Sequence, residues 1–268
     1  MRLTFLGTGT SSGVPIIGCE CTICTSTDPR NARLRCSAYL ELPGGSCVLI
    51  DCGPDFRTQA LRARIRRVDH VLITHEHADH IGGMDDLRVF NFRSGAALPI
   101  HAGSSTIASL RTRFDYCFNP VQIGGGIPQF DLRPAVAYEP MFIDDVEFLP
   151  VPYKHGIIDV TGWRIGRALA YITDCSSMTP RALEAIRGVD TLVLNALRPK
   201  PHPTHLSISE AVALAQEIGA RHTWFIHMTH DVDHSTTDAT FPEGIHLAWD
   251  EQQIDVPVGH ALRMPGGN

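Results

Sequence analysis

Four potential metal ligands occupy six consecutive positions directly after an apolar run. The run ends at Thr74 and is followed by His75-Glu76-His77-Ala78-Asp79-His80. Side chains two positions apart in an extended segment point the same way, so His75 and His77 can converge on one ion while Asp79 and His80 face a second. Imidazoles with a carboxylate are typical ligands of Zn, Mn or Fe. A polar turn with surface histidines is the alternative, but a turn has no reason to carry so many ligands.

Three further candidate ligands stand at the ends of separate apolar runs. His155 follows a run that ends near Val151, Asp174 follows Ala168-Leu169-Ala170-Tyr171-Ile172-Thr173, and His227 follows Thr223-Trp224-Phe225-Ile226. This pattern is expected of a site built at the strand ends of a layered α/β protein. Each residue alone is more often a cap or a satisfied polar group, whereas together with the first cluster they complete two ligand sets.

The order of these residues resembles the metallo-β-lactamase superfamily, and the resemblance covers essentially the whole chain. It implies one domain over residues 1–268 with an α/β fold, a four-layer αβ/βα sandwich, and a dinuclear site at one edge of two facing sheets. It also implies the ligand sets. One metal would be held by His75, His77, His155 and Asp174, and the other by Asp79, His80, His227 and the shared Asp174.

Asp51 follows Val48-Leu49-Ile50 and precedes Cys52-Gly53. By the same resemblance it matches a buried aspartate that positions the ligands from behind. Such a role is physically reasonable, because a metal-bound imidazole needs its other N–H held. The alternative is a polar residue that ends a strand before a glycine turn.

Three cysteines lie within six positions, at Cys19, Cys21 and Cys24. They are too close to pair comfortably with one another, and the spacing is typical of three thiolates of a tetrahedral zinc site that needs a fourth ligand. The start of the chain reads as a strand rather than a secretory leader, so we expect a reducing, cytoplasmic location. The other cysteines have apolar neighbours and are expected to be buried thiols; they are Cys36, Cys47, Cys52, Cys117 and Cys175.

Within the superfamily, the cysteine cluster is similar to that of the cyclic phosphodiesterases of the carbon–phosphorus lyase pathway, which hydrolyse phosphoribosyl 1,2-cyclic phosphate. In that family a histidine three places beyond the last active-site ligand closes a structural zinc site, and His230 occupies that place. The alternative is a surface histidine beside a ligand. A related cluster occurs in the pyrroloquinoline-quinone biosynthesis protein of the same superfamily, so the motif is not unique to one reaction.

A proline-rich segment at residues 195–206 contains His202 and His205. In the phosphodiesterase family a histidine matching His205 is the general acid. An imidazole can protonate a poor leaving group near neutral pH. His202 is a competing candidate, but His205 directly precedes Leu206-Ser207, which opens the next expected helix. Arg198 is expected to meet the substrate phosphate, with a solvated arginine as the alternative, and Asp79 is expected to act in catalysis as well as in metal binding.

The resemblance predicts a hydrolase with two divalent cations, Mn or Zn with Fe as a further candidate, and one structural Zn. A small phosphodiester is the expected substrate. The formal net charge of −6 disfavours nucleic acid as a partner, and no apolar run is long enough to cross a bilayer. A homodimer is plausible by resemblance only. Other hydrolases of RNA, thioester or lactone substrates, and a non-hydrolytic role in cofactor biosynthesis, would use the same ligands.

The remaining pattern predicts strands at 2–7, 36–42 and 46–51 and helices at 54–65, 83–92, 104–114, 179–187 and 207–218. The segment Gly7-Thr8-Gly9-Thr10-Ser11-Ser12-Gly13 lacks the Gly-Lys-Ser/Thr ending of a nucleotide-binding loop and is interpreted as a tight strand-to-loop turn. Gly124-Gly125-Gly126 predicts a flexible loop.

Overall fold

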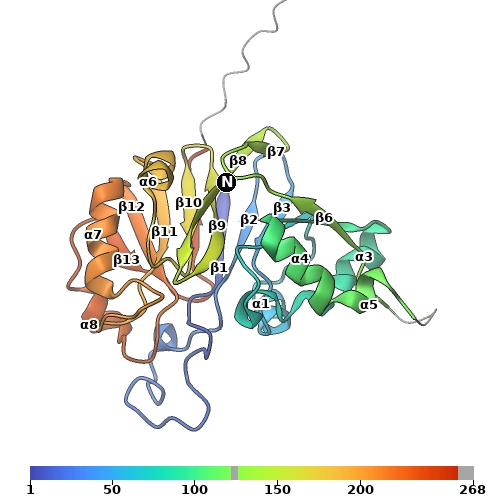
Figure 1. Ribbon diagram of the computed structural model, residues 1–268. Coiled ribbons are helices and arrows are strands. Elements are labelled where there is room, and N and C mark those ends of the chain that lie inside the picture. The colour runs from blue at the N-terminus through green and yellow to red at the C-terminus, as the bar shows by residue number, and fades with distance from the viewer. Residues whose placement is uncertain (122–125, 259–268) are drawn as a thin grey trace, which may run out of the picture.

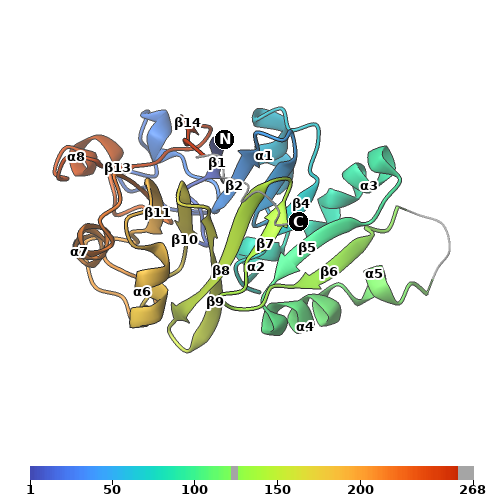
Figure 2. The same ribbon diagram turned by 90° about the horizontal axis from the view of Figure 1, so that it is seen from above.

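The computed structural model describes residues 1–121 and 126–258. Two seven-stranded sheets pack face to face, and helices cover both outer faces (Figures 1 and 2). The expected four-layer αβ/βα sandwich is therefore confirmed. The glycine run predicted as a flexible loop lies largely outside the described residues. Within the described ranges no helix is long and apolar enough to cross a membrane.

The first sheet has the strand order β14-β1-β2-β3-β4-β5-β6. Strands β3 to β6 run parallel to one another, and β1, β2 and β14 join through antiparallel pairs. Its strands are β14 (Gln253–Asp255), β1 (Arg2–Gly7), β2 (Ser37–Glu41), β3 (Cys47–Ile50), β4 (His70–Leu72), β5 (Leu98–Ala102) and β6 (Phe130–Pro134).

The second sheet has the order β13-β12-β11-β10-β9-β8-β7. Strands β10 to β13 are parallel, whereas β7, β8 and β9 form an antiparallel meander that continues to β10. Its strands are β13 (Ile245–Leu247), β12 (His222–Ile226), β11 (Thr191–Asn195), β10 (Leu169–Ile172), β9 (Ile158–Ile165), β8 (Val146–His155) and β7 (Met141–Ile143).

The helices divide between the two outer faces. They are α1 (Phe56–Arg62), α2 (Ala78–Ile81), α3 (Arg88–Ser94), α4 (Ser104–Arg113) and α5 (Asp115–Phe118) beside the first sheet, and α6 (Pro180–Ile186), α7 (Ile208–Ile218) and α8 (His234–Asp238) beside the second (Figure 1). Two short 3-10 turns are η1 (Pro29–Asn31) and η2 (Met84–Leu87).

Three apolar clusters hold these layers together. One lies between the sheets and contains Phe148, Trp163 and Tyr171 from the second sheet opposite Leu3 and Phe5 of the first. A second lies under α6 and α7, and a third lies under α1, α3 and α4. The parallel strands are buried on both faces, which is why they appear in the sequence as short continuous apolar runs.

Most of the predicted elements are present within a few residues. The helix predicted over 83–92 is divided into η2 and α3, and the expected helix over 54–65 is the shorter α1. The expectation of buried thiols is correct for Cys36, Cys52 and Cys175. It is wrong for Cys47 and Cys117, which are only partly buried; Cys47 is the first residue of β3, and Cys117 lies on the four-residue helix α5, which has no buried residue.

Candidate metal centre

The candidate ligands come together because their strands end at the same edge of the sandwich. Strands β10 and β12 are parallel, and β8 runs in the same direction because it is two antiparallel pairings away from β10. His155 is the last residue of β8, Asp174 follows β10, and His227 follows β12. The cluster His75-Glu76-His77-Ala78-Asp79-His80 follows β4 and runs into α2.

Three residues at this edge adopt a left-handed backbone conformation that residues other than glycine rarely adopt. The φ angles are 59° at Asp51, 55° at Asp174 and 62° at His227. Each residue directly follows a strand or lies one residue beyond it, so the chain turns sharply and presents the side chain at the sheet edge. Such strain in residues without a glycine's freedom is found preferentially at functional sites.

One cluster contains the side chains of His75, His77 and His155, with one possible ligand atom from each within 4.8 Å of the others. Nε2 of His75 lies 3.0 Å from Nδ1 of His77. Two nitrogens bound tetrahedrally to one zinc ion would be separated by about 3.3 Å. The Nδ1 atom of His155 is 2.7 Å from the backbone oxygen of Thr204, so its Nε2 is left for the cluster.

The second cluster contains Asp79, His80 and His227, and Asp174 lies between the two clusters. Nε2 of His80 is 3.3 Å from an oxygen of Asp79 and 3.2 Å from Oδ2 of Asp174. Nε2 of His227 is 3.0 Å from Oδ1 of the same carboxylate. Because Asp174 directs one oxygen to each histidine, it has the position expected of a shared ligand.

Asp51 lies behind the second cluster and is fully buried. Oδ2 of Asp51 is 2.7 Å from Nδ1 of His80, and the carboxylate also accepts hydrogen bonds from the backbone N–H and hydroxyl of Thr74. Nδ1 of His80 therefore carries a hydrogen, which leaves Nε2 free to bind a cation. The position agrees with the supporting role expected of this aspartate.

The donor set fits divalent cations. His80 Nε2 and both ring nitrogens of His227 are buried, and none makes a hydrogen bond to a described residue, although carboxylate oxygens lie 3.0 Å from His227 Nε2 and 3.2 Å from His80 Nε2. Burial disfavours ionisation of Asp174, but His227 and His80 hold its pKa well below the usual value. Conversely, burial opposes charging of His227, while Asp174 raises its pKa to about 9. Buried nitrogens without partners beside ionised carboxylates suit a dinuclear metal site.

His205 joins the edge from the segment between β11 and α7. Its Nε2 is 2.9 Å from Oδ1 of Asp174, and its ring stacks on that of His227 at a centroid distance of 4.8 Å. His202 lies beyond it, away from the clusters. Arg198 is in the same segment and partly buried; its guanidinium donates to the backbone oxygen of Pro201 at 3.4 Å, and its Nε has no partner among the described residues.

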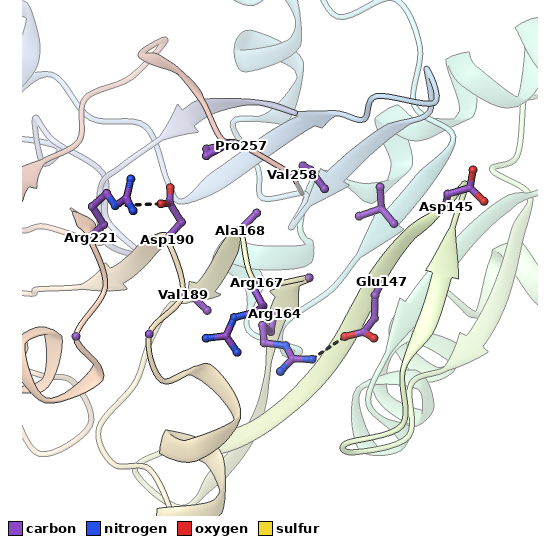
Figure 3. A pocket seen from close by; sticks show the side chains of 14 residues that line it. Asp145, Glu147, Arg164, Arg167, Ala168, Val189, Asp190, Arg221, Pro257 and Val258 are labelled. Carbon is purple, nitrogen blue, oxygen red and sulfur yellow. Dashed lines mark hydrogen bonds and ion pairs between the residues drawn. The ribbon is translucent and has the colours of Figure 1, made fainter. Parts of the chain in front are cut away.

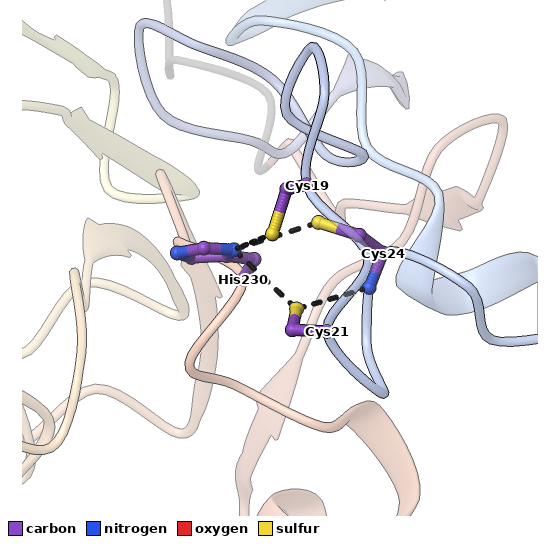
Figure 4. A group of neighbouring side chains, drawn as sticks. All are labelled: Cys19, Cys21, Cys24 and His230. Carbon is purple, nitrogen blue, oxygen red and sulfur yellow. Dashed lines mark hydrogen bonds between the residues drawn. The ribbon is translucent and has the colours of Figure 1, made fainter.

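The cysteines and His230 form a separate group (Figure 4). Nδ1 of His230 lies 3.3 Å from Sγ of Cys19 and 3.5 Å from the sulfurs of Cys21 and Cys24. A nitrogen and a sulfur bound tetrahedrally to zinc would be separated by about 3.6 Å. The backbone N–H of Cys24 contributes to lowering the pKa of Cys21 to about 6, which favours a thiolate. The group therefore suits a structural zinc ion that links the first loop to the segment after β12.

A cavity of about 920 Å³ lies at the opposite edge of the second sheet, where β10, β11 and β12 begin (Figure 3). Its lining includes Arg164, which pairs with Glu147 at 2.6 Å, and Asp190, which lies 3.4 Å from Arg221. None of the candidate metal ligands lines it. The cavity is therefore separate from the metal centre.

Sequence reasoning missed several residues that hold the ligands. Thr74 and Thr204 position Asp51 and His155 as described above, and a lone threonine gives no sequence signal for this. The turn at Gly7–Gly13 pairs with Met228, because Thr10 donates its N–H to the Met228 oxygen and Met228 donates to Thr8. Asp250 in turn accepts two hydrogen bonds from Thr8. The predicted tight turn therefore braces the segment between His227 and His230.

Comparisons with known proteins agree with this arrangement. Residues 47–228 match the family described as the beta-lactamase superfamily domain. A solved structure of "a new diphosphatase from the PhnP family" superimposes with a TM-score of 0.87, at 42% identity, over 95% of this chain and 97% of that one. Zn(2+)-bound PqqB from Methylobacterium extorquens has the same fold, with a TM-score of 0.78 and 18% identity over 95% of this chain and 100% of that one.

A protein of Porphyromonas gingivalis named octanoyltransferase is 36% identical over 254 residues, which are 93% of this chain. They make up only 50% of that protein, so the chain spans about half of its length. The family match covers more than half of this chain, and the identity with the diphosphatase extends over nearly the full length of both. The chain therefore belongs to the metallo-β-lactamase superfamily and, within it, to the PhnP family.

Proposed function

We propose that this chain is a dinuclear metal-dependent phosphodiesterase that hydrolyses a small cyclic phosphodiester, such as phosphoribosyl 1,2-cyclic phosphate. The observation that best supports this is the position of His205, whose Nε2 is 2.9 Å from the carboxylate shared by both ligand clusters. Such a residue can deliver a proton to an oxygen that leaves phosphorus. The relationship to a diphosphatase supports phosphorus as the centre of attack.

We propose the ligand sets that the family resemblance implies. One cation would be held by His75, His77, His155 and Asp174, and the other by Asp79, His80, His227 and Asp174. When bound, two divalent cations supply Lewis acidity at phosphoryl oxygens and make water a better nucleophile at neutral pH. Zn and Mn suit this donor set, with Fe as a third candidate.

The chain's own side chains would divide the remaining work. Asp79 fixes the outer side of the second cluster, Arg198 directs a guanidinium toward the phosphate, and His205 donates the Nε2 hydrogen to the departing ribosyl oxygen. Burial lowers the pKa of His205 to about 4, which makes it a strong acid but leaves little of the charged form near neutral pH. An anionic phosphodiester bound beside it would raise this pKa again.

Diphosphate hydrolysis is the second candidate, because the 42% identical relative is a diphosphatase. Octanoyl transfer has less support, since the half of that relative that this chain does not match can carry the activity. The net charge of −6 argues against RNA as substrate. We also propose a structural Zn at the cysteine group and, from the family resemblance, a homodimer, which size-exclusion chromatography with light scattering tests.

The test is hydrolysis by protein loaded separately with Mn and with Zn. The substrates are a five-membered ribosyl cyclic phosphate, an aryl phosphodiester, a nucleoside diphosphate and an aryl thioester. Turnover of the cyclic ester well above the others supports the proposal. Preference for the diphosphate would move the chain to the second candidate, and turnover of the thioester alone would overturn both.

A further inference from the structure

Arg33 is a buried arginine that lies beside the cysteine group and is only 1% exposed. Its Nη2 donates to the backbone oxygen of Val232 at 2.8 Å and to the side-chain oxygen of Asn31 at 3.1 Å, and its Nη1 donates to the backbone oxygen of Thr229 at 3.3 Å. All three acceptors are neutral oxygens, although burying a charged group is costly. A residue of this kind is expected to fix one arrangement of the chain rather than to add stability.

The two backbone oxygens that Arg33 contacts are the first and the last of the turn that carries His230. The N–H of Val232 also donates to the oxygen of Thr229, which closes this turn. From the turn, the His230 ring reaches the sulfurs of the three cysteines (Figure 4). Arg33 therefore holds both ends of the His230 turn, and with them the direction of the imidazole.

The cysteine loop, residues 15–25, is held from the same place. At its start, Val14 and Arg33 exchange backbone hydrogen bonds of 2.8 and 2.7 Å. At its end, Nδ2 of Asn31 donates to the hydroxyl of Ser26 at 3.1 Å, while Oδ1 of Asn31 accepts the N–H of His234 at 2.8 Å. The two halves of the cysteine group are therefore joined by protein contacts that do not involve a metal.

We propose that Arg33 is a positioning residue for the cysteine group: it holds the His230 turn at the distance from the cysteine sulfurs that zinc requires, so that the site is formed before the ion binds. Asn31 assists from the side of the cysteine loop. A site without this support would bind zinc more weakly, because the ion would have to order the two segments itself. This inference rests on the proposed structural zinc and is independent of the proposed reaction.

Cobalt in place of zinc makes the site visible. Protein produced in cobalt-containing medium should show a thiolate-to-cobalt charge-transfer band, which arises only from cobalt bound to sulfur and therefore not from the histidine and aspartate clusters. Titration with a chelator gives the concentration that removes half of this band. We expect Arg33→Met to lower that concentration about 10–100-fold, because methionine is apolar and donates to neither backbone oxygen.

Two further variants test the same contacts. Arg33→Lys can donate to one of the two backbone oxygens and should give an intermediate value. Asn31→Ala removes the contact with Ser26 and should lower the concentration in the same direction. The matched control is Arg164→Met, because Arg164 also donates to a backbone oxygen, that of Ala185 at 3.1 Å, but lies at the opposite edge of the second sheet. It should release cobalt as the parent does.

The inference would be overturned by an Arg33→Met protein that releases cobalt at the same chelator concentration as the parent. An equal change in Arg164→Met would also overturn it, since general loss of stability would then explain the effect. If Arg33→Met does not fold, Arg33→Lys and Asn31→Ala decide by the same comparison. Absence of the charge-transfer band in the parent would refute the structural zinc and this inference with it, whereas the proposed reaction is judged separately by turnover.

Discussion

Nε2 of His205 lies 2.9 Å from Oδ1 of Asp174, the carboxylate that also contacts His80 and His227. This distance allows His205 either to donate a proton beside the metal centre or to act as an additional ligand, because His155, Asp174 and His205 also form a compact group. In the proposed ligand sets His155 and Asp174 bind the metals, and we assign His205 the role of proton donor.

Replacement of the two residues should separate these roles. His205→Ala should retain both active-site metals and lower kcat by roughly 10²–10⁴-fold, because only the proton donor is removed. Asp174→Ala should abolish activity and metal loading together, since it removes the shared ligand. Metal content by inductively coupled plasma mass spectrometry and kcat, measured on the same preparations, give the comparison.

The matched control is His222→Ala, because His222 is an exposed histidine at the other end of β12. It should keep both metal content and rate. Loss of a metal equivalent from His205→Ala would show that His205 is a ligand, and the proton donor would then have to be another group.

Asp51 should affect metal affinity without contacting a metal. Asp51→Asn keeps the size of the side chain but removes one charged acceptor, so His80 is held less firmly. We expect metal affinity to fall roughly 10–100-fold, as is usual for residues that support a ligand from behind. Competition with a chelator measures the change.

Asp131→Asn is the control, because Asp131 is an exposed acid on β6 that pairs with Arg133. An Asp51→Asn protein that binds metal as tightly as the parent would contradict the supporting role. Thr74→Val, which removes one hydrogen bond to Asp51, should give a smaller loss in the same direction.

The sequence located the candidate ligand residues because each follows a short apolar strand, and strands of this kind can be recognised as apolar runs in the sequence. It did not reveal β9, whose eight residues include Gly162. A glycine inside a run usually argues against a strand. In the structure a Cβ at Gly162 would come within 2.5 Å of Ile172 Cδ1 and 2.7 Å of Tyr153 Cε1, so the buried side chains on the neighbouring strands would have to move. This lack of space for a side chain arises from packing between strands and cannot be recognised from a single sequence.

The relationship between His202 and His205 was equally hidden. Three residues of spacing in a proline-rich segment do not specify which ring nitrogens meet. That geometry depends on backbone hydrogen bonds that tie the loop to Cys175, just after β10, and to Thr229, just after β12. The local sequence pattern therefore located the candidate site, whereas the contacts that orient its side chains can be seen only in the folded structure.

The cysteine group should stabilise the whole protein. His230→Ala removes the fourth donor, so one equivalent of zinc should be lost along with the link between the loop at Cys19 and the segment after β12. A loss of about 4 kcal/mol would lower Tm by roughly 10 °C for a chain of this size. Differential scanning calorimetry and zinc content provide the test.

Cys117→Ser is the control, because Cys117 is a partly buried thiol on α5 outside the group. Its Tm and zinc content should stay close to those of the parent. An unchanged Tm in His230→Ala despite loss of zinc would show that the ion does not stabilise the fold.

A pair of neighbouring histidines away from the metal centre, of which His101 is buried and His70 half-buried, should make stability depend on pH. Nε2 of His101, on β5, lies 3.2 Å from Nδ1 of His70, and burial, aided by His70 and Arg133, lowers the pKa of His101 from 6.5 to about 4. Between about pH 6.5 and pH 4, His101 is therefore protonated in the unfolded chain but remains neutral in the folded protein. Stability from this group is complete above pH 6.5 and is lost as the pH falls toward 4.

The expected loss from His101 is about 2 kcal/mol between about pH 7.5 and about pH 5, at 1.36 kcal/mol per unit below the unfolded pKa. Urea unfolding at the two pH values measures it, and His101→Leu should lose correspondingly less stability than the parent over the same interval. His222→Ala removes an exposed histidine instead and should follow the parent. Comparing how steeply the free energy of unfolding falls with pH cancels the protonation of the candidate metal ligands, which all three proteins share. Equal slopes for His101→Leu and the parent would mean that His101 takes up its proton in the folded protein as readily as in the unfolded chain.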